Sequence, residues 1–268
     1  EPVLREDLFF ALVAFYNSNS KYYGDAINEL EFEKCLKECE RTFIAIEISD
    51  DTKTIIRFQN PSIKDFLLKY LSTYPELIKH LIISAIYFNQ FYNIFSTDKY
   101  SDKVYLNDFA QRIIFGKIKK IFYNCPTSIL IHTFDSHNFE FIWKVDHLTP
   151  LERLLKIAEL FQNGTHKDVP QFLINEFYKI DLQEEVFGEY ELNLYLSFLI
   201  IASAWEEFPF DEIFQQIFAE DKIENFESLK AVSRSKLYFP IEYQQFKDNH
   251  DQDIASLIEN VIDKEYRD

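Results

Sequence analysis

The chain of 268 residues contains no methionine, only 4 glycines and only 8 prolines. Glycine and proline punctuate β-sandwiches and glycine-rich nucleotide folds, so their scarcity argues against both classes. Since Glu1 stands where an initiator methionine is expected, we expect an excerpt of a longer polypeptide. Hydrophobic residues make up 47% of the chain and aromatic residues 17%, which is enough for a substantial core. These proportions predict a mainly α-helical protein with one large domain or two smaller ones.

Several kinds of site are also missing from the sequence. The three cysteines, Cys35, Cys39 and Cys125, lack the spacing of a zinc site, and the six histidines are scattered, so no metal site is expected. The single Gly-Lys pair, Gly116-Lys117, is no P-loop, so no catalytic residue and no cofactor site for nucleotide hydrolysis are expected in this segment. No apolar run reaches the roughly 18–20 residues that span a bilayer. We therefore expect a cytoplasmic protein with buried thiols and no membrane partner.

Acidic residues dominate the charge, and they are concentrated toward the C-terminus. The formal net charge is -17, and residues 151–268 hold 25 acidic and 11 basic side chains, a net of -14. Residues 1–85 and 86–150 are close to neutral, at -4 and +1. A negative field repels phosphate backbones and anionic lipids, so nucleic acid is not an expected partner. Basic protein surfaces fit this charge better.

The N-terminal third combines helices with a β-hairpin. Apolar residues recur at helical spacing over residues 4–17 and again over residues 27–41. The period then changes, because residues 42–48 and 54–58 are rich in β-branched and aromatic side chains, and residues 49–53 have turn composition. Helices followed by a two-stranded hairpin predict a winged-helix domain, which we place with its following helices in residues 1–95.

The hairpin runs into another predicted helix. Ser62 and Asp65 have the spacing of a capping box, and this helix should stop near Tyr74. Pro75 then begins a helix that is expected to reach about Phe95. An irregular α-helical array, expected to act as a sensor or interaction region, fills residues 96–268. Its predicted helices cover residues 107–123, 127–134, 137–144, 149–162, 168–180, 190–206, 209–219, 223–231 and 251–266.

One stretch carries a family resemblance. From Phe58 to Leu71 the sequence reads FQNPSIKDFLLKYL, and Cys39 to Ile44 before it reads CERTFI. This pattern resembles the winged-helix part of bacterial STAND-type NTPases, in particular the novel STAND groups of anti-phage defence. The resemblance covers roughly residues 1–95 and is strongest over residues 39–75.

The resemblance implies a nucleotide-controlled switch. In STAND proteins an upstream P-loop domain binds ATP or ADP, and the winged helix closes over it at rest. The family's phosphate-contacting position, often His, falls on Asn60 here. An asparagine side chain can still donate a hydrogen bond to phosphate. The implied partners are the upstream nucleotide-binding domain and either another protein or further copies of the chain.

The same motif also has a purely structural interpretation. Phe58, Phe66 and Leu67 would then be core residues, while Ser62 and Asp65 would cap the helix. A capping role is preferred for Ser62 and Asp65, whereas a ligand contact by Asn60 is as well supported as its absence.

Two other functions stay open. The first is an acidic, helical protein-binding module that captures a basic partner. The second and weaker is a DNA-binding winged helix, since the candidate recognition helix around residues 29–41 carries five glutamates that would repel phosphate. A basic cluster around Lys117, Lys119 and Lys120 is interpreted as a solvated helix face or an acidic-partner contact. The aromatic residues of the C-terminal helices are expected to pack in the core: Phe198, Trp205, Phe208, Phe210, Phe214 and Phe218.

Overall fold

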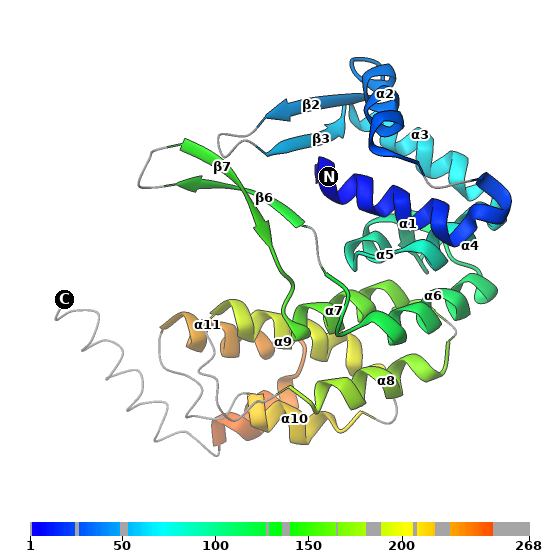
Figure 1. Ribbon diagram of the computed structural model, residues 1–268. Helices are drawn as coiled ribbons and strands as arrows, with labels where there is room; N and C mark the ends of the chain where they lie inside the picture. Colours follow the sequence, from blue (N-terminus) through cyan, green and yellow to red (C-terminus); the bar gives the residue numbers. More distant parts are fainter. Residues whose placement is uncertain are drawn as a thin grey trace. The chain divides into compact units, whose positions relative to one another are not determined.

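A computed structural model describes most of the chain, and it is mainly helical with a small antiparallel sheet (Figure 1). The described residues are 2–24, 27–48, 53–126, 129–135, 140–164, 166–180, 189–205, 208–217 and 226–248. They fall into two compact units, residues 1–148 with 160–166, and residues 149–159 with 167–268. The sequence placed its boundary near residue 95, which lies inside the first of these units.

The first unit opens with two helices and a three-stranded sheet. The helices are α1 (Arg5–Tyr23) and α2 (Glu29–Cys39), and the sheet has the order β1-β3-β2. In the hairpin β2 (Ile44–Ile48) pairs antiparallel with β3 (Thr54–Phe58), and β1 (Val3–Leu4) adds to the other edge of β3. The two helices and the hairpin predicted from periodicity are therefore confirmed. Their shared core is formed by Phe32, Leu36 and Ile56, against which Leu8, Phe9, Leu12, Ile44 and Ile46 pack.

The last turn of α1 is bent at Asn19. This buried residue leaves helical geometry, with φ -128° and ψ 20°, and its side-chain amide donates to the carbonyl of Phe15 at 2.8 Å and of His80 at 3.4 Å. A side chain that bonds nearby main chain in this way competes with the helical ladder. Gly24 then ends the helix at φ 86°, a conformation that glycine adopts without a steric penalty.

The helix expected from Pro75 to Phe95 is broken in two, so that prediction was wrong at its centre. It forms α4 (Pro75–Ser84) and α5 (Asn89–Ile94). In the gap, Gln90 Oε1 accepts hydrogen bonds from the main-chain N–H groups of Ile86 at 2.8 Å and Tyr87 at 2.9 Å. This side chain replaces the main-chain acceptors that a continuous helix would have supplied.

Tertiary contacts also stabilise the non-helical segment between α4 and α5. The hydroxyl of Tyr87 donates to Asp7 Oδ1 of α1 at 2.8 Å, and burial together with this bond raises the pKa of Tyr87. The thiol of Cys125 donates to the carbonyl of Ile86 at 2.9 Å. These partners are distant in sequence, so periodicity alone could not have located the break.

Beyond the break, a short parallel pair of strands, β4 (Phe95–Ser96) and β5 (Val104–Tyr105), precedes α6 (Asp108–Ile121). This helix matches the prediction over residues 107–123. Asn107 caps it by accepting a hydrogen bond from the main-chain N–H of Ala110 at 2.9 Å. Ile114, Phe115 and Ile118 form its buried side.

The helices predicted over residues 127–134 and 137–144 are absent, and two strands stand in their place. They are β6 (Ile129–Asp135) and β7 (Glu140–Asp146), paired antiparallel from Ile129 opposite Asp146 to Asp135 opposite Glu140. The stretches ILIHTFD and EFIWKVD are rich in β-branched and aromatic residues that favour strands. Short apolar runs of this kind do not distinguish helix from strand by periodicity, and pairing between the two runs decides the outcome.

The described residues of the second unit form helices joined by turns and contain no strand. Its main elements are α7 (Pro150–Phe161), whose last two residues belong to the first unit, α8 (Asp168–Phe177), α9 (Glu189–Ala202), α10 (Phe210–Ile217) and α11 (Phe226–Ser235), followed by a helix over residues 240–248. The predictions over 149–162, 168–180, 190–206 and 209–219 are confirmed. The one over 223–231 lies toward the N-terminal side of α11, and the one over 251–266 lies outside the described residues.

Aromatic side chains form the core of this unit. Phe198 and Phe214 are fully buried, and Phe208 is nearly so, which confirms the expected core packing for all three. The rings of Phe177 and Phe198 stack with centroids 5.0 Å apart and an interplanar angle of 4°. Phe218 lies outside the described residues.

Candidate functional site

Asn60 stands at the turn between the hairpin and the next helix, α3 (Pro61–Ser72). It occupies the N-cap position in extended geometry, its main-chain carbonyl accepts a hydrogen bond from Ile63 at 3.2 Å, and its side chain does not cap the helix. The residue is exposed. Its carboxamide therefore presents two N–H donors and one acceptor oxygen to solvent, the groups that a hydrogen bond to a phosphate oxygen requires.

The capping role expected for Ser62 and Asp65 was wrong. Proline favours the first helical position because its φ is preset and it has no N–H to leave unsatisfied, so α3 begins at Pro61, one residue before Ser62. Ser62 thus lies inside the first turn, which contains no acidic residue, and both Ser62 and Asp65 are exposed.

The apolar side of α3 is only partly buried, which differs from the expectation drawn from its sequence. Leu68 is 8% exposed and lies in the core, but Phe66 is 64% and Leu67 38% exposed. The core positions expected for Phe66 and Leu67 were therefore wrong, while Phe58 is half-buried. Tyr70 and Tyr74 are exposed as well. We call Phe66, Leu67, Tyr70 and Tyr74 the α3 surface.

Three rings of the α3 surface form a continuous row. Phe66 and Tyr70 stack with centroids 6.4 Å apart, and Tyr70 and Tyr74 follow at 4.7 Å. Phe66 and Tyr70 lie above one another because they are four residues apart on α3, and Tyr74 continues the row two residues beyond the end of the helix. A hydrogen bond between the hydroxyls of Tyr70 and Tyr74 raises the pKa of Tyr70. The row offers a large apolar area with hydroxyls at one end.

Such a row is suited to binding another protein surface. Removing apolar area from water contributes roughly 25 cal/mol per Å², and aromatic side chains dominate the energetics of many interfaces. Contiguous exposed apolar area usually marks an interaction site. On the opposite side α3 packs against α4, β3 and β5, so this helix is anchored while its aromatic row faces outward.

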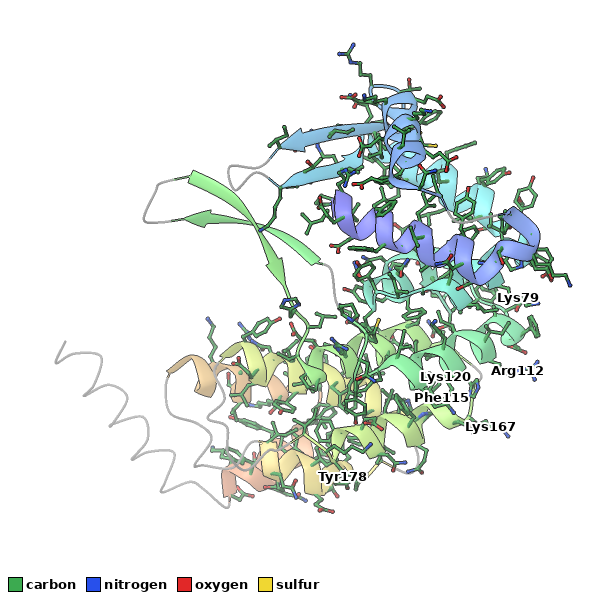
Figure 2. The ribbon with its side chains drawn as sticks, viewed as in Figure 1. Lys79, Arg112, Phe115, Lys120, Lys167 and Tyr178 are labelled. Atoms are coloured by element: carbon green, nitrogen blue, oxygen red, sulfur yellow. The ribbon has the colours of Figure 1, made fainter. Side chains whose placement is uncertain are left out.

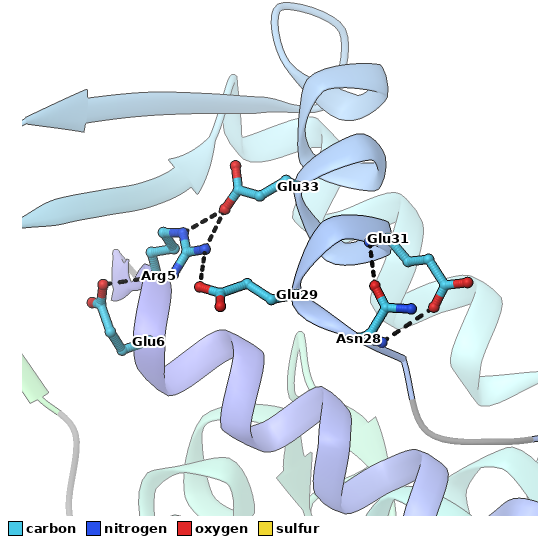
Figure 3. Close-up of polar contacts among 6 residues, drawn as sticks. All are labelled: Arg5, Glu6, Asn28, Glu29, Glu31 and Glu33. Atoms are coloured by element: carbon cyan, nitrogen blue, oxygen red, sulfur yellow. Dashed lines mark hydrogen bonds and ion pairs between the residues drawn. The ribbon is translucent and has the colours of Figure 1, made fainter.

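Two acidic residues of α2, the candidate recognition helix, bond Arg5 of α1 (Figure 3). Arg5 Nε donates to Glu33 Oε1 at 2.6 Å, and its Nη2 donates to Glu29 Oε1 at 3.0 Å. The guanidinium also lies 5.5 Å from the centroid of the Phe32 ring. The hydrogen bond that Arg5 donates to Glu33 is the main reason why the pKa of Arg5 is raised.

A capping box begins the same helix. Asn28 accepts from the main-chain N–H of Glu31 at 3.0 Å, and Glu31 Oε2 accepts from that of Asn28 at 3.1 Å. The carboxylates of Glu29, Glu31 and Glu33 thus stabilise the fold. They give this helix no positive surface that could bind a phosphate backbone.

The basic cluster on α6 also serves packing. Ile118 and Phe122 are buried, as a core stripe requires, and the exposed Arg112 and Lys120 extend from this helix (Figure 2). Lys117 Nζ donates to the carbonyl of Ile83 at the end of α4 at 2.8 Å, and burial lowers the pKa of Lys117. Lys119 Nζ lies 4.7 Å from the centroid of the Phe115 ring.

The remaining candidate groups are dispersed. Cys125 is buried, as expected, whereas Cys35 is exposed and Cys39 half-buried, so the expectation of buried thiols holds for one of the three. His80 is buried beside Tyr23, whose hydroxyl is 3.1 Å from His80 Nδ1. Within the described ranges, no three His, Cys, Asp or Glu side chains gather as metal ligands. None of the described helices combines the length and apolarity needed to cross a bilayer.

Comparison with known proteins gives no relative. The chain matches no protein-family model, no curated protein and no solved structure.

Proposed function

We propose that this chain is the regulatory segment of a STAND-type signalling NTPase, in which α1, α2, the β2–β3 hairpin and α3 act as a winged helix that responds to bound nucleotide. The observation that carries the proposal is the α3 surface. It follows Asn60 along the same helix, so a domain that covered these exposed rings would also approach the exposed Asn60 carboxamide. The order of helix, helix, hairpin and helix supports the same assignment.

The mechanism is a two-state movement. In the resting state an upstream P-loop domain holds ATP or ADP and packs on the α3 surface, with Asn60 donating a hydrogen bond to the nucleotide phosphates. In the active state the winged helix moves as a rigid body and the α3 surface is released. Only interactions that differ between the two states bias this equilibrium, so the rings and Asn60 are the groups whose replacement changes it. The setting is the cytoplasm, and anti-phage defence is the biological role that the resemblance suggests.

The test uses the longer polypeptide. The first requirement is a Walker A motif within a few hundred residues upstream of Glu1 in the reading frame. With that polypeptide, Phe66→Ser and Tyr70→Ser should release bound ADP faster, because each weakens the resting interface. The matched control is Tyr100→Ser, since Tyr100 is 97% exposed on the loop between β4 and β5.

Variants of Asn60 distinguish a phosphate contact from packing at the interface. Asn60→Asp should weaken ADP binding more than Asn60→Ala, because a carboxylate repels phosphate whereas alanine only removes a donor. Unchanged ADP release in the two ring variants, or no upstream Walker A motif, would refute the proposal.

The second candidate is an acidic protein-binding module, which the net charge of -14 over residues 151–268 favours. Capture of a basic partner that is lost at moderate salt and indifferent to ATP and ADP would support it over the switch.

A further inference from the structure

A second exposed apolar surface lies in the second unit, between α11 and the helix over residues 240–248. Leu237 is 80% exposed, Ile241 68% and Tyr238 56%. We call these three residues the 237–241 surface. Large apolar side chains at such exposure are common singly, but here three within five residues concentrate apolar area at one turn.

The turn between the two helices fixes this surface. The main-chain N–H groups of Leu237 and Tyr238 donate to the carbonyls of Arg234 and Ser235 at 3.1 and 3.0 Å, which closes the end of α11. Phe239 is buried, with its ring centroid 4.5 Å from that of Phe210. Because Phe239 is anchored in the core, its neighbours Leu237, Tyr238 and Ile241 are held outward.

The local charge is opposite to that of the rest of this half of the chain. Residues 230–248 carry four basic side chains, Lys230, Arg234, Lys236 and Lys247, and two acidic ones, Glu242 and Asp248. This gives a net of +2, although residues 151–268 as a whole have a net charge of -14. The 237–241 surface therefore fits an acidic, amphipathic partner segment.

The chain itself contains such a segment. Residues 251–268 carry six acidic and two basic side chains, a net of -4. Their apolar residues recur at helical spacing, and they are Ile254, Leu257, Ile258, Val261 and Ile262. The sequence thus predicts a helix over residues 251–266 with one apolar stripe and acidic side chains around it.

The connection is short enough to set the register. Only residues 249 and 250 separate the described helix over 240–248 from the predicted helix, and connections of two to five residues join antiparallel helices. Ile241 lies seven residues before Asp248, and Ile258 lies seven after Asp251. At a rise of 1.5 Å per residue, each is about 10 Å from the turn, so the two side chains come level.

We propose that the 237–241 surface binds the chain's own residues 251–266, which fold back along the helix over 240–248 as an antiparallel hairpin. Leu257 and Ile258 meet Ile241, and Val261 and Ile262 meet Tyr238 and Leu237. The acidic side chains of the segment then face the basic side chains of residues 230–248.

Disulfide scanning in the full chain tests the proposal. Ile241→Cys is combined with one further cysteine in a Cys35→Ser, Cys39→Ser background, where the buried Cys125 is retained. The stripe positions for the second cysteine are Leu257, Ile258, Val261 and Ile262, and the control positions on the polar side are Ser256, Glu259, Asn260 and Asp263. A disulfide requires Cα atoms within about 7 Å, so mild oxidation should join stripe positions to residue 241 severalfold faster than control positions.

Other scanning results overturn the proposal. Equal rates at stripe and control positions, or no disulfide at any position, would exclude a docked hairpin. Disulfides formed only between two chains would assign the surface to a second copy.

Proteolysis gives an independent check. Ile241→Asp should make residues 251–266 more sensitive to chymotrypsin, whereas Gln171→Asp, at an exposed position of α8 in the same unit, should leave the cleavage rate unchanged. Unchanged circular dichroism of both variants controls for misfolding. Equal cleavage of the two variants contradicts the proposed contact.

Discussion

The exposure of the α3 surface predicts opposite outcomes for two neighbouring truncations on one helix. Leu68→Ala removes a side chain that is 8% exposed, and deletions of buried leucine cost about 2–5 kcal/mol. Phe66 is 64% exposed, so only about a third of its roughly 1.5–3 kcal/mol burial free energy is realised in this chain. Alanine is also the better helix former by roughly 0.5 kcal/mol, which offsets most of that loss. Phe66→Ala should therefore be close to neutral.

Hydrogen exchange of peptides covering residues 61–72 measures both effects without assuming that the two units unfold together. A difference of about 2 kcal/mol between the variants corresponds to roughly thirtyfold faster exchange in Leu68→Ala. Equal acceleration in both would mean that Phe66 is as buried as Leu68, which would remove the basis of the α3 surface. No acceleration in either would mean that α3 is not anchored through Leu68.

Three further outcomes follow from described contacts. Arg5→Met should destabilise the packing of α1 on α2 by about 1–3 kcal/mol, measured by urea denaturation, and 1 M NaCl should reduce the difference from wild type. Because the pKa of Tyr87 is raised by burial and by Asp7, its stabilisation is complete below about pH 10 and falls as pH rises above it, so Tyr87→Phe should flatten the alkaline loss of stability. A thiol reagent should modify Cys35 within the native chain and reach Cys125 only after unfolding; modification of both at one rate would contradict the burial of Cys125.

The N-terminal elements could be predicted because their signals are local. The stripe of α1 and α2 has the helical period, and the hairpin has two β-branched runs around a turn. The ion pairs that join these helices could not be predicted, since Arg5 and its partners Glu29 and Glu33 are 24 and 28 residues apart. Only the fold brings them together.

The errors arose where a local pattern has two structural solutions. The runs that form β6 and β7 satisfy both helix and strand composition, and their mutual pairing selects the strand. The stripe on α3 predicted a buried face, but a stripe reports only that a side is apolar. Whether Phe66 is buried depends on a partner surface that the described chain does not supply.

For the candidate site, the sequence correctly placed Asn60 at the strand-to-helix turn. The assignment of the cap to Ser62 failed by one position because Pro61 is the better first residue of a helix. The exposed row of Phe66, Tyr70 and Tyr74 had a sequence signal in its spacing of four residues. Of these three residues only Phe66 was expected in the core, because most apolar stripes on helices are buried.

The outermost strand of the N-terminal sheet limits what can join it. Among the described strands β2 pairs with β3 alone, and the main-chain carbonyl of Ile44 on the outer side of β2 accepts a hydrogen bond from the main-chain N–H of Arg41 at 3.0 Å. Arg41 holds a left-handed conformation with φ 67° to do so. The carbonyl of Ile44 is therefore not available to pair with a strand from another molecule. Such a strand would have to pair with the part of β2 nearer the exposed Ile48.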